Sequence, residues 1–255
     1  MEQVYAYTYT IATKKGASRA IFLNGVLRPP PNGRAHFACG RNVLLGTCLS
    51  PVTDIDSRVI LVGGFHEMVE LCEALGVGIV GIIDPNLTGT YLGHQVLGRD
   101  EDATKLFAEM GPLPVVVTPD APAVRERLQS HYAQVGFRFR GLVHPTAQIS
   151  RIARIGAGSV IQAQAQVSSQ AEIGDYAKLN VGATVMHDSL VGAFTTIAPA
   201  AVVLGRVRVG RGCYIGANAT LLPGLSVGDR AVVGAGAVVT RSVPEGATVK
   251  GNPAR

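Results

Sequence analysis

His187 is followed directly by Asp188, and this pair is the candidate for acid–base chemistry in the sequence. A carboxylate next to an imidazole can hold one ring nitrogen protonated and leave the other free to accept a proton near neutral pH. His187 is also the only histidine between His144 and the C-terminus. A lone surface histidine is more often incidental than catalytic, so the elements that position it must be identified.

Both residues lie within a six-residue repeat that runs from Val143 to Val239. Every sixth residue is aliphatic, a mostly small residue recurs four places later, and glycine often follows the aliphatic one. A period of six is incompatible with an α-helix, and it predicts short parallel strands joined by tight corners, three hexads to a coil. We therefore expect a parallel β-helix over 143–255, closed at one end by its tail, 241–255.

The repeat also places other residues relative to His187, which occupies the third, outward place of its hexad. Gly205 is expected one coil after His187, where its N–H could approach a ligand oxygen that gains negative charge. Ala217 and Ala235 are likewise one coil apart, and small residues leave room for an extended ligand along the column.

A different pattern precedes the repeat, because short apolar runs alternate there with amphipathic stretches. The six segments, in chain order, are 59–62, 67–75, 77–83, 100–110, 115–117 and 121–134. This alternation predicts a small doubly wound, Rossmann-like α/β domain over 58–142. Residues 1–57 are predicted as an extension of unknown role. In it 4–11 alternates like a strand, which could be part of a hairpin added to the α/β domain.

Two features of the predicted α/β domain could bind a nucleotide. Gly63 and Gly64 follow the first strand and open the first helix, where backbone amides can meet a phosphate. Asp84 ends the second strand, where acidic side chains often bind a ribose or base. The full GxGxxG motif is absent, so a plain tight turn at the glycines and a simple strand end at Asp84 both stay open.

Composition limits the partners. The 5% of aromatic residues fits a core of thin layers, and the net charge of +5 comes from scattered basic residues, so no nucleic-acid partner is expected. A modest positive field suits a small anionic substrate, although a simple solvated surface explains it equally well.

The four cysteines show no metal-site or disulfide spacing, and no metal is expected. With neither a signal peptide nor an apolar run long enough for a membrane span, the chain is expected in the cytoplasm.

The run from Leu179 to Gly192, with Asn180 and the His187-Asp188 pair, and the ending 251–255 resemble the bacterial sugar acetyltransferases of the hexapeptide-repeat superfamily. These include the sialic acid O-acetyltransferases and the nucleotide-amino-sugar N-acetyltransferases. The resemblance covers 58–255. It implies a left-handed β-helix, a homotrimer with active sites between subunits, and acetyl-CoA as co-substrate.

The resemblance also implies roles for single residues. His187 is the base, Asp188 orients it, and Asn180 contacts the sugar. Acetyl-CoA would be bound through backbone groups at Gly205, Ala217 and Ala235, and the nucleotide-linked sugar at Gly64, His66 and Asp84. Two positions depart from the family: Val62 replaces the first glycine of the nucleotide loop, and Thr196 replaces a second histidine that some members have near acetyl-CoA.

The sequence thus predicts an acetyl-CoA-dependent N-acetyltransferase acting on a nucleotide-linked amino sugar, by direct attack with His187 as general base. O-acetylation of sialic acid or a related sugar is the first alternative, and a non-catalytic solenoid scaffold is the second. A zinc hydro-lyase would need three histidine ligands, but the repeat supplies only His144 and His187. A dinucleotide-dependent oxidoreductase built on 58–142 would need the complete glycine motif.

Overall fold

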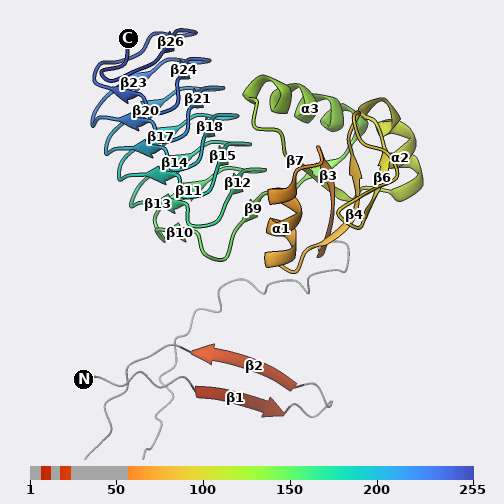
Figure 1. Ribbon diagram of the computed structural model, residues 1–255. Coiled ribbons are helices and arrows are strands. Elements are labelled where there is room, and N and C mark those ends of the chain that lie inside the picture. Colours follow the sequence, from red (N-terminus) through yellow and green to blue (C-terminus); the bar gives the residue numbers. More distant parts are fainter. Residues whose placement is uncertain (1–6, 13–17, 24–56) are drawn as a thin grey trace, which may run out of the picture. The chain divides into compact units, whose positions relative to one another are not determined.

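The computed structural model describes residues 7–12, 18–23 and 57–255 (Figure 1). Strands β1 (Tyr7–Ala12) and β2 (Ser18–Leu23) pair antiparallel in a sheet of their own. This hairpin belongs to a unit separate from residues 50–255. The expected strand at 4–11 is confirmed from Tyr7 onward, and the remainder of the predicted extension to 56 lies outside the described residues.

The α/β domain is built on one mainly parallel sheet in the order β5-β6-β4-β3-β7-β8, of which only the β5–β6 pair is antiparallel. Its elements are β3 (Arg58–Val62), α1 (His66–Ala74), β4 (Gly78–Ile83), β5 (Thr90–Tyr91), β6 (His94–Gly98), η2 (Asp100–Asp102), α2 (Ala103–Met110), β7 (Pro114–Val117), α3 (Pro122–Val135) and β8 (Arg138–Phe139). The six predicted segments are confirmed within a few residues. Strands β5, β6 and β8 were not predicted. Strands of only two residues, such as β5 and β8, carry no periodic signal.

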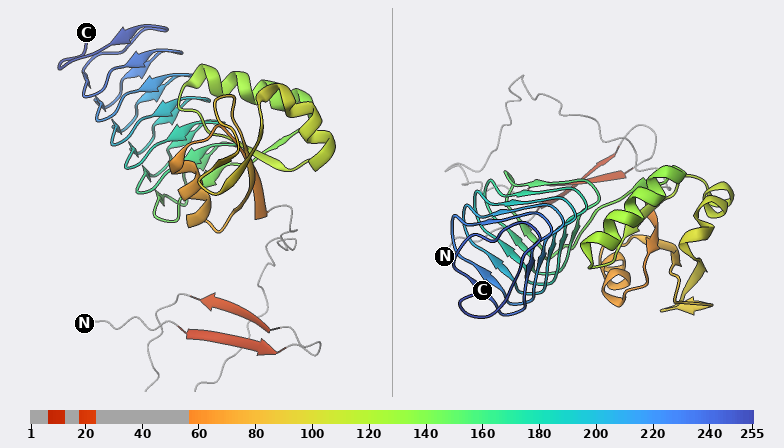
Figure 2. Two further views of the ribbon diagram at one scale, coloured as in Figure 1. Left: turned by 45° about the vertical axis from the view of Figure 1, so that its right-hand side comes forward. Right: turned by 90° about the horizontal axis from the view of Figure 1, so that it is seen from above.

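The central strand β3 is apolar along its length because both faces of the sheet are covered. Val59 and Leu61 pack with α1, whereas Ile60 and Val62 pack with α2 and α3. Figure 2 shows these helices on the two faces of the sheet. A fully buried parallel strand therefore reads as a continuous apolar run, as the sequence has it.

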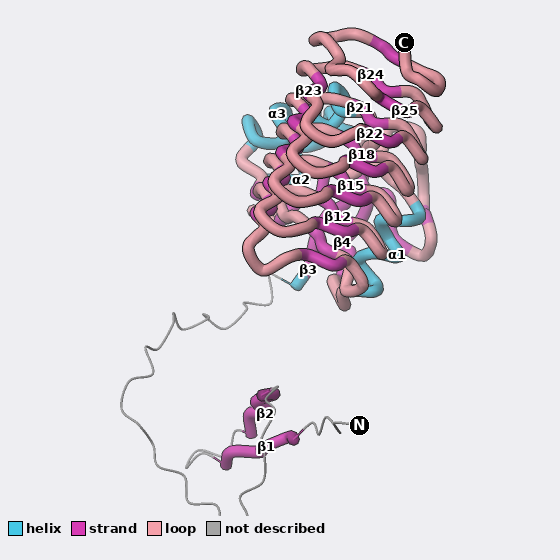
Figure 3. The backbone as a smooth tube through the Cα atoms, turned by 90° about the vertical axis from the view of Figure 1, so that its left-hand side faces the viewer, coloured by secondary structure: helices cyan, strands magenta, loops and turns pink. Residues whose placement is uncertain are grey.

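The β-helix is made of two-residue strands that recur every six residues, and its coils are left-handed (Figure 3). The strands are β9 (Leu142–Val143), β10 (Gln148–Ile149), β11 (Arg154–Ile155), β12 (Val160–Ile161), β13 (Gln166–Val167), β14 (Glu172–Ile173), β15 (Lys178–Leu179), β16 (Thr184–Val185), β17 (Leu190–Val191), β18 (Thr196–Ile197), β19 (Val202–Val203), β20 (Arg208–Val209), β21 (Tyr214–Ile215), β22 (Thr220–Leu221), β23 (Ser226–Val227), β24 (Val232–Val233), β25 (Val238–Val239) and β26 (Thr248–Val249).

Three parallel sheets form the sides of a triangular prism, and we name each by its strand in the coil that carries His187. The β15 sheet has the order β26-β24-β21-β18-β15-β12-β9, the β16 sheet β10-β13-β16-β19-β22-β25, and the β17 sheet β11-β14-β17-β20-β23. The second residue of each strand points inward, and from Ile161 to Val239 these residues are at most 3% exposed. The six-residue repeat is thereby confirmed as the source of the core.

The two ends of the prism differ. Val143, in the first coil, is 38% exposed. At the other end the tail forms a shorter coil, since Val243 bridges Val227 and β26 pairs with β24. Ala254 then packs against the prism core, so the tail covers this end.

The α/β domain packs against the outer face of the β15 sheet. Leu142 and Val160 of that sheet share one apolar cluster with Met68 and Leu71 of α1. Because each coil contributes one strand to each sheet, the corner between the β16 and β17 sheets lies opposite the β15 sheet. Figure 2, right, shows the triangular outline with the α/β domain along one side.

Candidate active site

His187 and Asp188 lie at the β16–β17 corner of the prism. Nδ1 of His187 is 2.7 Å from Oδ2 of Asp188, and the two side chains are 46% and 44% exposed. Asp188 has a φ of +59°, and this left-handed turn conformation brings its carboxylate back to the imidazole. Since a carboxylate accepts hydrogen bonds, Nδ1 carries the proton and Nε2 is left as the basic nitrogen.

Gly205 lies directly above His187, one coil further along. The N–H of Arg206 donates to the His187 carbonyl (3.0 Å), and a Cβ at position 205 would be only 2.7 Å from Nε2 of His187. Glycine is therefore required for the imidazole to lie where it does. The Gly205 N–H has no acceptor among the described residues. Pro223, one coil further, has no N–H to offer.

Ala217 and Ala235 lie at a different corner from His187. The N–H of Gly236 donates to the Ala217 carbonyl (2.8 Å), so these two alanines are one coil apart, as expected. They follow strands of the β15 sheet and hence belong to the β15–β16 corner. The structure therefore does not bring them together with Gly205 in one chain.

Asn180 lies on the side of the prism that the α/β domain covers. It is 6% exposed, and its Nδ2 donates to Oδ1 of Asp120, in the loop between β7 and α3 (3.3 Å). Asp120 was not predicted as a site residue. Neither was Lys178, which is 1% exposed and lies 2.7 Å from the same carboxylate. Thr196 is also buried here and donates to the Asp120 carbonyl (2.6 Å), so it faces no open groove in this chain.

The carboxyl ends of the central α/β strands bring together two of the predicted nucleotide-binding residues. The Gly64 N–H donates to Oδ2 of Asp84 (2.9 Å). The preceding Gly63 has a φ of +102°, and a Cβ there would lie 2.4 Å from Oγ1 of Thr118, so only glycine fits. Since β3 has β4 on one side and β7 on the other, this edge is the switch point at which doubly wound sheets bind ligands.

His66, the third predicted nucleotide-binding residue, is the first residue of α1. Its Nδ1 is 3.0 Å from the Tyr91 hydroxyl, and the two rings meet edge to face. No side chain caps this helix, so its first amides are available to an anion. Gly64, His66 and Asp84 thus border one edge of the sheet.

Arg125 of α3 joins the α/β domain to the prism. Its guanidinium donates to the carbonyls of Pro119 and Asp120 in its own domain, and to Tyr176, Phe194 and Thr196 of the prism. The side chain is 1% exposed, and burial lowers the pKa of Arg125 to about 10. Losing one of these neutral partners typically costs about 1.5–3 kcal/mol, the range for a hydrogen bond to a charged group.

The predicted site residues therefore form two sets in one chain. His187, Asp188 and Gly205 lie at the β16–β17 corner. Gly64, His66, Asp84 and Asn180 lie on the α/β side, with Ala217 and Ala235 at the β15–β16 corner. The two sets are on different sides of the prism, with the β16 sheet between the two corners.

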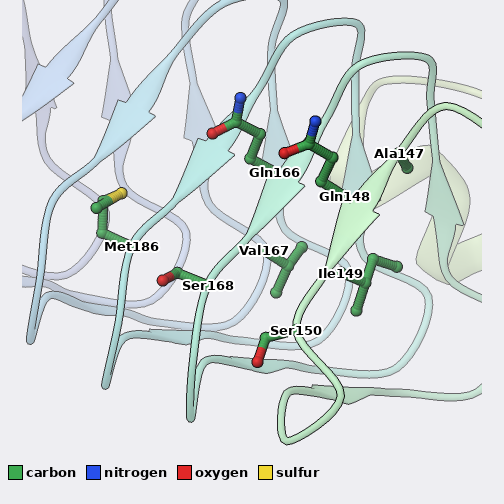
Figure 4. A pocket seen from close by; sticks show the side chains of 8 residues that line it. All are labelled: Ala147, Gln148, Ile149, Ser150, Gln166, Val167, Ser168 and Met186. Carbon is green, nitrogen blue, oxygen red and sulfur yellow. The ribbon is translucent and has the colours of Figure 1, made fainter. Parts of the chain in front are cut away.

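The outer face of the β16 sheet is hollowed near the first coils. A hollow of about 510 Å³ is lined by Ala147, Gln148, Ile149, Ser150, Gln166, Val167, Ser168 and Met186. Figure 4 shows the amides of Gln148 and Gln166 side by side on this face. None of the predicted site residues lines it, but Met186 immediately precedes His187.

The described part of the chain contains no group of three or more His, Cys, Asp or Glu side chains that could hold a metal ion. None of its helices combines the length and the apolar character that a bilayer crossing requires.

Comparisons with known proteins give the family. The models "Hexapeptide repeat of succinyl-transferase" and "Bacterial transferase hexapeptide (six repeats)" match residues 206–241 and 188–223. No curated protein matches the chain by sequence.

Solved structures match almost over their full length. The acetyltransferase domain of PglB from Neisseria gonorrhoeae, in complex with acetyl coenzyme A, is 34% identical with a TM-score of 0.73, covering 78% of this chain and 98% of that one. PerB from Caulobacter crescentus, a perosamine N-acetyltransferase in complex with CoA and GDP-perosamine, is 32% identical (TM-score 0.73; 77% and 95%). WeeI from Acinetobacter baumannii is 29% identical (TM-score 0.69; 77% and 98%). At this identity and coverage, the chain belongs to the sugar acetyltransferases of the hexapeptide-repeat superfamily, and it is an acyltransferase.

Proposed function

We propose that the chain transfers the acetyl group of acetyl-CoA to the amino group of a nucleotide-linked amino sugar, with His187 as general base. One observation carries the proposal: the bond between His187 Nδ1 and Asp188, which leaves Nε2 basic and next to Gly205. The related structures support the substrate class, since PerB is in complex with GDP-perosamine and PglB with acetyl coenzyme A.

In the proposed reaction the sugar amine attacks the thioester carbonyl carbon, and His187 Nε2 takes the proton that the amine loses. A C–N bond forms, the C–S bond breaks, and the proton passes from the imidazolium to the departing CoA sulfur. The products are an acetamido sugar and free CoA thiol, with no covalent enzyme intermediate. Asp188 stabilises the imidazolium and keeps its ring oriented.

Gly205 is proposed to stabilise the negative charge that develops on the thioester oxygen. Its N–H has no acceptor among the described residues, and it adjoins the imidazole. A fixed backbone donor at such a position lowers the barrier because it needs no reorganisation during the reaction.

Gly64, His66 and Asp84 are proposed to bind the nucleotide. The uncapped start of α1 offers amides to a phosphate, and Asp84 lies at the neighbouring strand end. Asn180 would contact the sugar at the junction of this domain with the prism.

The active enzyme is proposed to be a homotrimer with its sites between subunits, acting in the cytoplasm. One chain carries its base and its nucleotide edge on opposite sides of a prism, so a complete site needs a second copy. The face next to the His187 corner is suited to such a contact. Met186, Leu204 and Leu222 form a half-buried apolar row along it.

N-acetylation is favoured over O-acetylation by the similarity to the perosamine N-acetyltransferase from Caulobacter crescentus. Acetylation of a sialic acid hydroxyl stays the alternative. The same base would serve an amine or a hydroxyl acceptor. Only the choice of acceptor sugar therefore distinguishes the two activities.

The test is a CoA-thiol release assay with acetyl-CoA against amino sugars and hydroxyl sugars linked to UDP, dTDP, GDP and CMP. Thiol release with an amino sugar is expected, and His187→Ala should lower kcat by about 100-fold to 10,000-fold. His144→Ala, the other histidine of the prism, is the matched control and should behave as wild type. Release with hydroxyl sugars alone would favour the O-acetyl alternative. If no acceptor releases thiol and acetyl-CoA does not bind, the enzyme proposal is wrong.

A further inference from the structure

Asp120 accepts hydrogen bonds from several side chains of the prism, at the edge of the candidate sugar site. Its Oδ1 lies 2.7 Å from Lys178 Nζ and accepts from Asn180 Nδ2 at 3.3 Å. Its carbonyl accepts from Thr196 Oγ1 at 2.6 Å. Lys178 and Thr196 are paired neighbours on β15 and β18, so one patch of the β15 sheet converges on this single loop residue.

This contact determines which way the Asn180 amide points. A carboxylate only accepts hydrogen bonds, so the NH₂ group of Asn180 must face Asp120 and its Oδ1 must face away. Oδ1 has no donor among the described residues. In that part of the chain no buried side-chain oxygen lacks a partner, so Oδ1 is open to solvent. Asn180 therefore presents an acceptor, and not a donor, to a ligand.

Lys178 holds Asp120 in place and connects it to the nucleotide edge. Its Nζ donates to the Thr118 carbonyl (2.8 Å), and Glu67 of α1 lies 3.8 Å away. The Thr118 hydroxyl in turn donates to the carbonyl of Gly63 (3.0 Å). A buried ammonium is costly unless it is paired, so Lys178 retains these partners.

We propose that Asp120 is a positioning residue: it fixes the Asn180 amide so that Oδ1 accepts a hydrogen bond from an N–H or O–H group of the acceptor sugar. Lys178 holds Asp120 in the orientation that this needs. The inference deepens the proposed function and rests on it. A sugar that lacks a hydrogen-bond donor at this point is bound less well, because the carbonyl is then left without a partner.

The first test is Asp120→Asn, which changes charge and hydrogen-bond polarity but hardly any volume. The neutral amide oxygen accepts more weakly from Lys178 Nζ and from Asn180 Nδ2 than the carboxylate does, so the orientation of Asn180 is held less firmly. We expect kcat/KM for the sugar to fall by about tenfold to 100-fold. The KM for acetyl-CoA should not change. An unchanged kcat/KM for the sugar overturns the inference.

The second test exchanges the two groups. Asn180→Asp alone sets two carboxylates against each other and should also lose activity. Combining it with Asp120→Asn removes the repulsion between the two carboxylates, and again leaves an oxygen of residue 180 directed at the sugar. The double variant should have a higher kcat/KM than either single variant. Losses that simply multiply would contradict the inference, since a purely structural role predicts them.

Glu126→Gln is the matched control. Glu126 pairs with Arg211 across the same interface at 2.6 Å, and its side chain is 44% exposed, against 45% for Asp120. It should have wild-type kinetics. Thermal unfolding of each variant checks the fold, and Asp120→Ala carries the same prediction if Asp120→Asn does not fold. Failure of the wild type to acetylate any amino sugar contradicts the proposed function. Equal activity of wild type and Asp120→Asn contradicts this inference alone.

Discussion

The imidazole of His187 occupies the space that a side chain at Gly205 would need, since a Cβ there would lie 2.7 Å from Nε2. Gly205 does not have a positive φ, so its backbone conformation is open to alanine. Glycine is therefore required at this position because of the His187 ring, and not because of the backbone conformation.

Gly205→Ala should therefore lower activity without unfolding the protein. The methyl group must displace the imidazole, and we expect kcat to fall by about 100-fold because a misplaced base loses most of its effect. Steady-state kinetics and thermal unfolding measure the two properties separately. In a His187→Ala background the same change should cost nothing further. An equal loss in both backgrounds would show that the methyl group acts elsewhere.

Asp188→Asn should lower kcat by about tenfold to 100-fold, because an amide can either donate or accept and no longer fixes the tautomer of His187. The φ of +59° at this position is well tolerated by asparagine, so the fold should be retained. Asp175→Asn is the control, since Asp175 only accepts from the Ala157 N–H at another corner (2.8 Å). Identical kcat values for wild type and Asp188→Asn would remove Asp188 from the mechanism.

Mixed trimers should show whether one site needs two chains. His187→Ala chains retain the nucleotide edge, and Asp84→Ala chains retain the base, although each is expected to be nearly inactive alone. Co-refolding them in equal amounts should restore activity to about a quarter of the wild-type value, the fraction of random interfaces with both parts intact. A mixture as inactive as its components would indicate that each site lies within one chain.

Alkaline pH should destabilise the α/β domain. Burial, followed by the negative charge of Asp100, raises the pKa of Tyr132 well above its ordinary value of 10.0, and burial raises the pKa of the Cys72 thiol from 9.0 to about 11. The unfolded chain therefore releases protons that the folded chain retains. The contribution to stability is full below about pH 9 and is lost as the pH rises through 10 and above.

Urea unfolding between pH 8 and pH 11 measures this loss. Tyr132→Phe removes the bond from the hydroxyl to Asp100 (2.9 Å), which costs about 1 kcal/mol at neutral pH. It should also make stability fall less steeply above pH 10. An unchanged slope would mean that the phenol does not contribute.

The prism and the α/β sheet were predictable because buried positions appear in the sequence as regular patterns of apolar residues. Every inward place of the repeat must be aliphatic or small, and β3 must be apolar on both faces. The His187–Asp188 contact was predictable for a local reason, because the residues are adjacent and share one corner.

The junction of the two domains was not predictable. Lys178 occupies an outward strand position, as Arg154 and Arg208 do, and the sequence does not distinguish them. Only the packing of the α/β domain on the β15 sheet makes Lys178 buried while the other two stay exposed. Asp120 lies in a loop, its partners on the prism are 58 to 76 positions away, and no periodic signal reports such contacts. The position of Ala217 within its hexad was predicted correctly. A position in the hexad does not by itself say at which of the prism corners the residue lies.

The bonds of Arg125 have a consequence for how ligands are selected. Three of the five hydrogen bonds of this buried side chain join α3 to Tyr176, Phe194 and Thr196 of the prism, and the other two hold the loop that precedes α3. A hinge at this junction would have to break several of these bonds at once, so the phosphate-facing edge and the stacked coils keep a constant separation. An acceptor sugar is then selected by its length: a molecule too short to reach from the proposed nucleotide edge to the prism cannot be accommodated by closure, however well either of its ends fits.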